Sequence, residues 1–193
     1  MEITTEIIKE LRELTGISVM QCKKALEEVG GDLAKAEVIL KKRSAEAAAK
    51  KAERTLKAGI IGTYTHEEII GAMVLLSCES DFVAKNPEFV ALARTIAMQV
   101  AATDPKYVTT AEIPSEARDA AIAVFEKEVA DKPAAIREKI MEGKLASYFQ
   151  EQVLLDQPFI KDETKTVLNL LNEATQKFGE RIEVSRFVRV SVR

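Results

Sequence analysis

The chain has 193 residues, 47% of them hydrophobic, which allows one substantial domain or a small domain joined to a medium one. Its 28 basic and 31 acidic residues give a net charge of −3, so no overall charge draws it to nucleic acid or to acidic membranes. No apolar run is long enough to cross a bilayer, and no basic region followed by an apolar stretch opens the sequence.

The first 40 residues have the spacing of three short helices. Apolar residues recur every three or four positions, and Gly16 is suited to end the first helix in a left-handed conformation. Ser18 is a good cap for the second helix, and Asp32 caps a third helix that we expect to run through Leu40. Three tight helices in so short a segment predict a small bundle over residues 1–40.

The composition changes over residues 41–57, where lysine and arginine alternate with alanine. Both kinds of residue favour helix, but the segment has no wide apolar stripe that a neighbour could bury. We therefore expect an exposed helical linker. Its positive charges are typical of a solvated helix face and need no nucleic acid to explain them, so we expect no direct nucleic-acid contact.

Residues 58–193 are expected to form an α+β core. Residues 59–65 and 69–78 have the apolar and β-branched character of two strands, joined by a short turn at residues 66–68. The second strand is apolar almost throughout, which predicts that both of its faces are buried.

Helices are expected between these strands and a late strand. Asn86 is a good cap and Pro87 suits the first helical position, so one helix begins there and ends at Asp104. Residues 182–192 alternate in polarity as a strand does, and a break of phase at Arg186 indicates a bulge. The core is thus predicted to be a small antiparallel sheet packed with helices. The further helices are expected over residues 115–130, 134–149 and 164–178.

The sequence offers few residues for catalysis or metal binding. His66, the one histidine of the sequence, falls in a predicted turn and has no second histidine at ligand spacing. Cys22 and Cys78 are too few for a disulfide framework, so we expect reduced, buried thiols in a cytoplasmic protein. We expect no catalytic residues, metal ligands or cofactor, although the paired carboxylates of a small hydrolytic enzyme would leave no signature at an unknown spacing.

Residues 79–87 connect a predicted strand to a predicted helix. On one interpretation they are a plain connection with a polar start and with Phe82 tucked into the core. On the other, Asp81 and Phe82 form a compact wedge at an exposed turn, because a ring can enter a partner's packed side chains while a carboxylate competes for polar groups there.

The second interpretation is favoured by a family resemblance that runs through essentially the whole chain. Its motifs are residues 10–16 (ELRELTG), 20–26 (MQCKKAL), 78–86 (CESDFVAKN), 157–159 (QPF) and 165–167 (KTV). The chain resembles elongation factor Ts, the bacterial guanine nucleotide exchange factor for elongation factor Tu. That family usually has threonine at the position of Ser80, a change that keeps the hydroxyl.

The resemblance implies a mechanism for the core. Ser80, Asp81, Phe82 and Val83 would enter the nucleotide-binding domain of elongation factor Tu, with Phe82 pushing between helices there. Magnesium needs near-ideal octahedral geometry and leans on the nucleotide phosphates, so a small displacement of its ligands would loosen both the ion and GDP. No covalent chemistry would occur on this chain.

The resemblance also implies a role for the bundle, which is similar to the ubiquitin-associated three-helix domain. Lys9, Arg12, Val19 and Met20 occupy positions where the family's N-terminal domain touches the same partner. Gln99 stands where relatives often carry histidine, so this sequence departs from the family pattern at that position.

Two further interpretations concern binding without exchange and self-association. The main alternative is an adaptor that uses a ubiquitin-associated-like bundle and does not promote nucleotide exchange. In addition, the apolar strand over residues 182–192 is expected at a sheet edge, where pairing with a second copy would give a homodimer.

Overall fold

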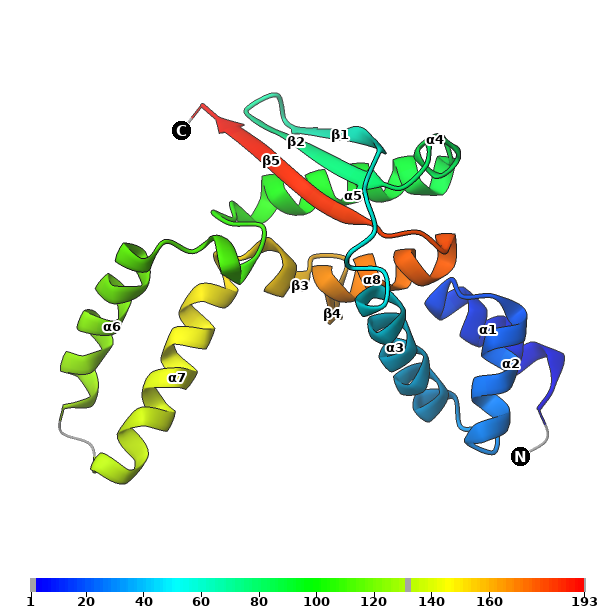
Figure 1. Cartoon of the computed structure of the whole chain (residues 1–193), viewed down its shortest axis with the longest axis horizontal. Helices are drawn as coiled ribbons and strands as arrows, with labels where there is room; N and C mark the ends of the chain where they lie inside the picture. The colour runs from blue at the N-terminus through cyan, green and yellow to red at the C-terminus, as the bar shows by residue number, and fades with distance from the viewer. Residues whose placement is uncertain (1–2, 131–132, 193) are drawn as a thin grey trace.

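The structure is a computed structural model that describes residues 3–130 and 133–192. It has the expected α+β class, with its elements in the order shown in Figure 1. The helices are α1 (Thr5–Thr15), α2 (Val19–Glu28), α3 (Leu33–Ala49), α4 (Asp81–Ala84), α5 (Pro87–Thr103), α6 (Ser115–Val129), α7 (Ala134–Gln150) and α8 (Val167–Phe178). The strands are β1 (Ala58–His66), β2 (Ile70–Cys78), β3 (Pro158–Phe159), β4 (Asp162–Thr166) and β5 (Glu183–Ser191).

The N-terminal bundle forms as the sequence predicts. Gly16 adopts a left-handed conformation with φ of 67° and ends α1, while the side chains of Ser18 and Asp32 accept backbone N–H groups at the starts of α2 and α3. The bundle has its own apolar core, made of Leu11, Ile17, Cys22, Ala25, Leu26, Ala36 and Leu40. Local capping signals and helical spacing were sufficient to predict where these helices begin, because the caps lie within a few residues of the groups that they bind.

The third helix does not end at Leu40, as the sequence suggested, but continues to Ala49. The expectation of an exposed linker helix is wrong at Ser44, which is buried and whose hydroxyl lies within hydrogen-bond distance of two acceptors, the Leu40 carbonyl and the side-chain oxygen of Gln176 on α8. Alanines of α3 lie beside α8 and β5. Small side chains let two backbones approach without a wide apolar stripe, which is why periodicity did not predict this packing.

The core contains a three-stranded antiparallel sheet in the order β1-β2-β5. The predicted hairpin is confirmed, and its turn places Glu67 and Glu68 at positive φ. The predicted bulge is also confirmed, since the register shifts opposite Leu75 and Leu76, with Ser185 as the extra residue of β5. The helix expected over residues 164–178 begins only at Val167, because the preceding residues form β4.

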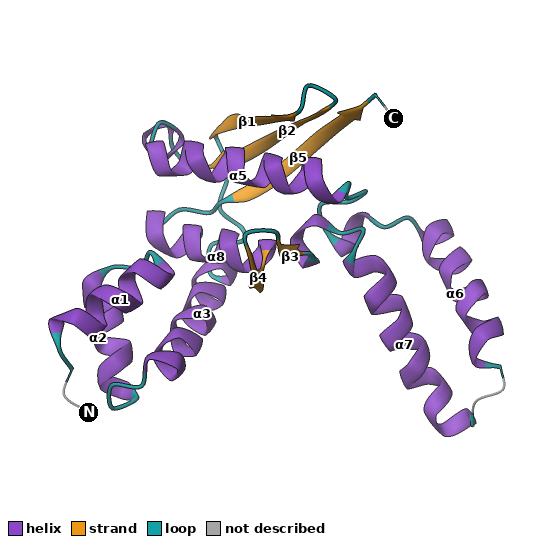
Figure 2. Ribbon diagram, turned by 180° about the vertical axis from the view of Figure 1, so that it is seen from behind, coloured by secondary structure: helices purple, strands orange, loops and turns teal. Residues whose placement is uncertain are grey.

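Helix α5 covers one face of the sheet, burying Phe89, Ile96 and Val100 against β1 and β2. The prediction that both faces of β2 are buried is wrong, because Met73 is 51% exposed on the opposite face. Figure 1 shows the helices on one side of this sheet, and Figure 2 shows the same arrangement from behind. The apolar side chains of β2 therefore lie alternately on a face that α5 covers and on a face that is exposed to solvent.

The three helices of the bundle and the antiparallel hairpin α6–α7 extend from opposite ends of the central body (Figures 1 and 2). The short helix α4 lies at the same end as the bundle, above α8 in Figure 1. Within residues 3–130 and 133–192, no helix combines the length and the apolar character that a membrane span requires.

Candidate functional site

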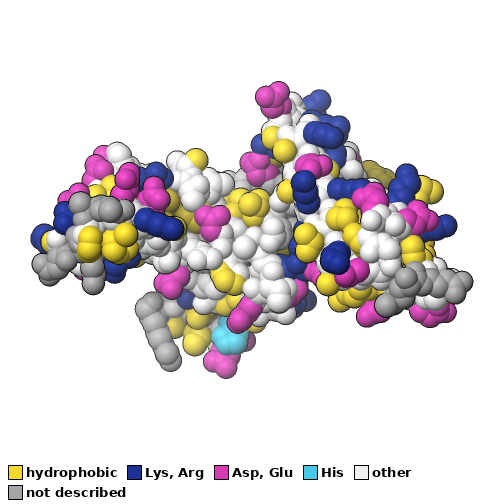
Figure 3. Space-filling model, turned by 90° about the horizontal axis from the view of Figure 1, so that it is seen from below, with side chains coloured by type: hydrophobic (Ala, Val, Ile, Leu, Met, Phe, Trp, Pro, Cys, Tyr) yellow, Lys and Arg dark blue, Asp and Glu magenta, His cyan; other side chains and the backbone are white. Residues whose placement is uncertain are grey.

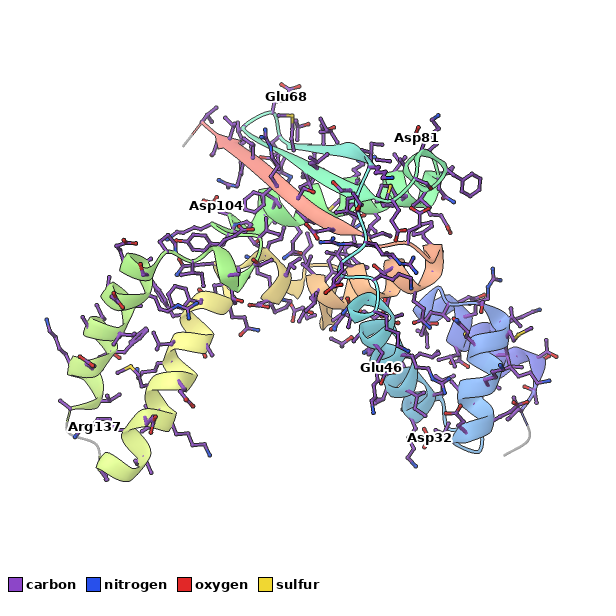
Figure 4. All side chains as sticks on the ribbon, viewed as in Figure 1. Asp32, Glu46, Glu68, Asp81, Asp104 and Arg137 are labelled. Atoms are coloured by element: carbon purple, nitrogen blue, oxygen red, sulfur yellow. The ribbon has the colours of Figure 1, made fainter. Side chains whose placement is uncertain are left out.

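The connection between β2 and α5 contains a single helical turn, α4, that projects a phenyl ring into solvent. Phe82 is 84% exposed, the highest exposed fraction among the large apolar side chains of the described residues. The interpretation that Phe82 is tucked into the core is therefore wrong. Asp81 beside it is also exposed, and Figure 4 shows it at the outer end of the sheet, pointing away from the body.

The same turn is fixed from beneath by buried side chains. Val83 and Ala84, which follow Phe82 directly, are nearly inaccessible and belong to the main core. The Ser80 hydroxyl caps the turn by accepting the Val83 N–H at 3.4 Å. Residues 80–83, the wedge segment, thus present two exposed side chains on a support that packs into the sheet and α5.

A carboxylate from a distant part of the chain holds the start of the wedge segment. Glu180 accepts the backbone N–H groups of Glu79 and Ser80, each at 3.0 Å, and the Ser80 hydroxyl at 2.5 Å. Sequence reasoning missed Glu180, because it lies 100 residues from Ser80 in the chain and no local pattern marks it.

The neighbouring carboxylate, Glu79, makes the reciprocal contact. It accepts the Arg181 N–H at 2.6 Å and pairs with the Arg54 guanidinium at 3.3 Å. These contacts, first the Arg181 N–H and then Arg54, lower the pKa of the Glu79 carboxyl. The chain before α4 is therefore tied to the residues that follow α8 by hydrogen bonds in both directions.

The expected docking residues share the surface of the bundle. Lys9 and Arg12 are exposed on α1, and Val19 and Met20 are exposed in the first turn of α2. Apolar side chains at the start of a helix that point to solvent are available to a partner. Leu14, which belongs to the apolar series of α1, is also half exposed, and periodicity could not distinguish it from the buried members of that series.

The bundle is connected to the core at α8 and β4. Lys165 donates to the Leu14 carbonyl at 3.3 Å, and the Gln176 amide donates to Gln21 at 3.2 Å. Glu173 pairs with Lys165 and is buried, and burial raises the pKa of its carboxyl despite the opposing effect of the lysine. The surfaces of the bundle and of the wedge segment are thus held at one end of the molecule (Figure 1).

Gln99 lies inside the protein, on the covered side of α5. Its amide donates to Gln157 and to the Pro158 carbonyl, each at 3.1 Å, and its oxygen accepts the Ile160 N–H at 2.9 Å. Because the residue is fully buried, it positions the β3 segment and is not available for a contact with a partner.

The other residues considered for chemistry lie apart from one another. His66 is exposed beside the hydroxyl of Tyr64, and both cysteines are buried, which raises the pKa of each thiol. The described residues contain no group of three or more histidines, cysteines and acids that could hold a metal ion. In the face seen in Figure 3, positive and negative side chains are interspersed, and no extended patch of one sign is visible.

Comparison with known proteins gives full-length matches. The model of a family described as elongation factor Ts matches residues 5–193. The elongation factor Ts of Thermodesulfovibrio yellowstonii is 49% identical over 193 residues, which cover 100% of this chain and 97% of the relative. That of Thermotoga petrophila is 48% identical with the same coverage, and that of Anaeromyxobacter sp. is 45% identical over 97% of this chain and 87% of its own length. The similarity therefore includes both the bundle and the core.

Proposed function

Because the chain belongs to the elongation factor Ts family, we propose that it is a guanine nucleotide exchange factor that acts on elongation factor Tu during translation elongation. The observation that carries the mechanism is the exposed phenyl ring of Phe82 on a turn whose neighbouring residues are buried. An exchange factor changes the affinity of its partner for a nucleotide and needs no active site of its own.

In the proposed mechanism, the wedge segment enters the nucleotide-binding domain of the partner. Phe82 separates packed side chains there, and Asp81 competes for polar groups near the magnesium ion. Because Mg²⁺ tolerates little distortion of its octahedral shell, small movements weaken its contacts with the nucleotide phosphates. GDP then dissociates, GTP binds, and the exchange factor is released.

The rigidity of the support favours this mechanism. The ring can separate packed side chains of a partner only if the backbone that carries it keeps its own conformation. Val83 and Ala84 are packed in the core, and Glu180 holds the segment that leads into the turn. The aromatic ring therefore enters a binding site without first having to be ordered, which reduces the entropic cost of association.

We assign residues 1–40 to a docking role, with Lys9, Arg12, Val19 and Met20 as the contact residues. Arginine and methionine suit protein interfaces, where they supply contact area and adaptable packing. Residues 58–193 would carry exchange, and the segment between would join the two parts. A partner that works in translation also implies that the protein acts in the cytoplasm, without direct contact to nucleic acid or membrane.

We also propose a weak homodimer that uses the end of the sheet. Strand β5 is an edge of the sheet, and its Val188 and Val190 side chains are exposed near Met73 of β2, at positions where the register pairs Met73 with Val188. Pairing or packing of this strand against a second copy would cover apolar area. The exposed Arg186 would approach its mate, and this repulsion keeps the association weak, whereas Arg189 donates to the Ala101 carbonyl and pairs with Asp104.

The alternative of an adaptor without exchange activity rests on the bundle alone. Such a protein has no use for an exposed aromatic ring on a supported turn, so the wedge segment favours exchange. A pull-down separates the two functions, because an adaptor would retain a ligand other than a GTPase.

The direct test measures the release of a fluorescent GDP analogue from elongation factor Tu by stopped flow, with and without this protein. We expect the release rate to rise with protein concentration and then saturate. A release rate that is unchanged at micromolar concentrations of this protein would overturn the proposed function.

A further inference from the structure

The carboxylate of Glu180 gathers three hydrogen bonds from two consecutive residues that precede the exposed ring. Its Oε2 accepts the N–H groups of Glu79 and Ser80, each at 3.0 Å, and its Oε1 accepts the Ser80 hydroxyl at 2.5 Å. Hydrogen bonds to an ionised acceptor are shorter and about twice as strong as bonds between neutral groups. A single side chain thus fixes both the backbone and the hydroxyl at this point.

The bond to the hydroxyl determines how Ser80 caps α4. A hydroxyl carries one proton, and here that proton is directed to Glu180, so the lone pairs remain to accept the Val83 N–H at 3.4 Å. α4 has four residues, far fewer than an isolated helix needs for stability. The turn that carries Asp81 and Phe82 therefore depends on this cap and on the carboxylate that orients it.

Glu180 is itself placed by the end of α8. Gly179, at φ of 74°, ends that helix, and the next two residues, Glu180 and Arg181, lie beside Glu79 and Ser80. The Arg181 N–H donates to Glu79 while the Glu79 N–H donates to Glu180, so the two segments are linked in both directions. The Arg181 guanidinium further donates to the Arg54 carbonyl at 2.8 Å. The position of Glu180 is thus set by α8 and β5, which belong to the rigid core.

We propose that Glu180 is the positioning residue of the exchange reaction: its carboxylate holds Glu79 and Ser80 so that Asp81 and Phe82 meet the partner in one orientation. This inference rests on the proposed function. In this role, Glu180 itself contacts neither the partner nor its nucleotide. With the bundle docked on the partner, the complex forms whether or not the wedge segment is ordered. The fraction of docked complexes in which the segment has the competent orientation therefore sets the maximal rate, while the half-saturating concentration reflects docking.

The first test compares Glu180→Gln with wild type in the GDP-release assay. Glutamine keeps the shape but offers one acceptor oxygen and one NH₂ group, which cannot accept the donors that now face it. We expect the maximal rate to fall about tenfold, the equivalent of one charge-assisted hydrogen bond, while the half-saturating concentration changes less than twofold. Glu163→Gln, an exposed position on β4, should leave both values unchanged.

A double-mutant cycle distinguishes positioning from a general structural effect. If Glu180 acts through the ring, Glu180→Gln should change the residual rate of Phe82→Ala less than twofold. Equal tenfold losses in the wild-type and Phe82→Ala backgrounds would overturn the proposal.

The pair Ser80→Thr and Ser80→Ala provides a second test, since threonine keeps the hydroxyl that bonds Glu180 and alanine removes it. Only the alanine variant should lose rate.

Hydrogen exchange measured by mass spectrometry tests the proposal without the partner. The Glu79, Ser80 and Val83 amides have acceptors in this network, so peptides covering residues 79–85 should exchange at least tenfold faster in Glu180→Gln, with bundle peptides unchanged. Unchanged protection of residues 79–85 would overturn the positioning role. If the wild-type protein fails to release GDP while these amides still lose protection, the proposed function fails and the structural assignment of Glu180 stands.

Discussion

Lys165 and Glu173 form an ion pair that is almost entirely removed from solvent, with 3.1 Å between Nζ and Oε1. The same ammonium donates to the Leu14 carbonyl at the end of α1, so the pair connects the bundle to β4 and α8. Burial raises the pKa of the Glu173 carboxyl, and Lys165 opposes this effect. A charge that costs free energy in the core is thus kept beside the junction of the two parts.

Replacing Glu173 by glutamine should change how stability depends on pH. Because the pKa of the carboxyl is raised in the folded protein, the folded state binds more protons than the unfolded state, and the wild type gains stability as pH falls from 7 toward about 4.3. Glu173→Gln lacks this contribution. The free energy of unfolding, measured in urea, should therefore increase more between pH 7 and pH 5 for the wild type than for the variant. Parallel pH profiles would contradict the burial of a charged Glu173.

Truncation of the exposed ring should remove most of the exchange activity. Central aromatic residues of interfaces commonly cost about 2 kcal/mol when truncated, which corresponds to about 30-fold, so Phe82→Ala should slow GDP release by at least that factor. Asp81→Ala should have a smaller effect. Val124→Ala, an exposed position on α6 at the other end of the molecule, is the control. A Phe82→Ala variant that is folded by circular dichroism and fully active would exclude the wedge.

Substitutions on the bundle should weaken docking without lowering the maximal rate of GDP release. Arg12→Ala and Met20→Ala each remove an exposed side chain from the surface assigned to docking. We expect the half-saturating concentration in the release assay to rise several-fold while the maximal rate stays within twofold, as for an interaction made equally before and during exchange. A lower maximal rate at saturation would mean that the bundle takes part in the exchange step itself.

Reciprocity predicts the affinities of the complex. If this protein weakens GDP binding, GDP must weaken the binding of this protein by the same factor, and magnesium should reinforce the effect. Titration calorimetry should therefore give a tighter complex with nucleotide-free elongation factor Tu than with the GDP-bound form. Equal affinity for the two forms is incompatible with an exchange factor.

The proposed homodimer depends on the exposed end of β5. Val190→Asp places a charge on the strand that would be covered, and we expect light scattering at micromolar concentration to shift from dimer toward monomer. Val124→Asp adds the same charge to α6, away from the sheet, and should leave the mass unchanged. A wild-type protein that is monomeric at high micromolar concentration would contradict the dimer.

The elements that depend on local signals were determined by the sequence alone. Caps at Ser18, Asp32 and Asn86 and the left-handed stop at Gly16 set helix ends that the structure reproduces. The strands of the hairpin follow from their apolar and β-branched character, and α6 (Ser115–Val129) and α7 (Ala134–Gln150) lie within one residue of the expected ranges. These signals act within a few residues, so they are readable without knowing what lies nearby.

Other features were decided by contacts between distant segments. α3 continues past Leu40 because its alanines pack on α8, and the open face of β2 depends on α5 covering only one side of the sheet. The motif at residues 78–86 predicted which residues would meet a partner, but the exposure of Phe82 and the hydrogen bonds from Ser80 to Glu180 came from the fold. Hydrogen bonds across 100 residues leave no periodicity or composition in the chain, because only tertiary packing brings the donor and the acceptor together.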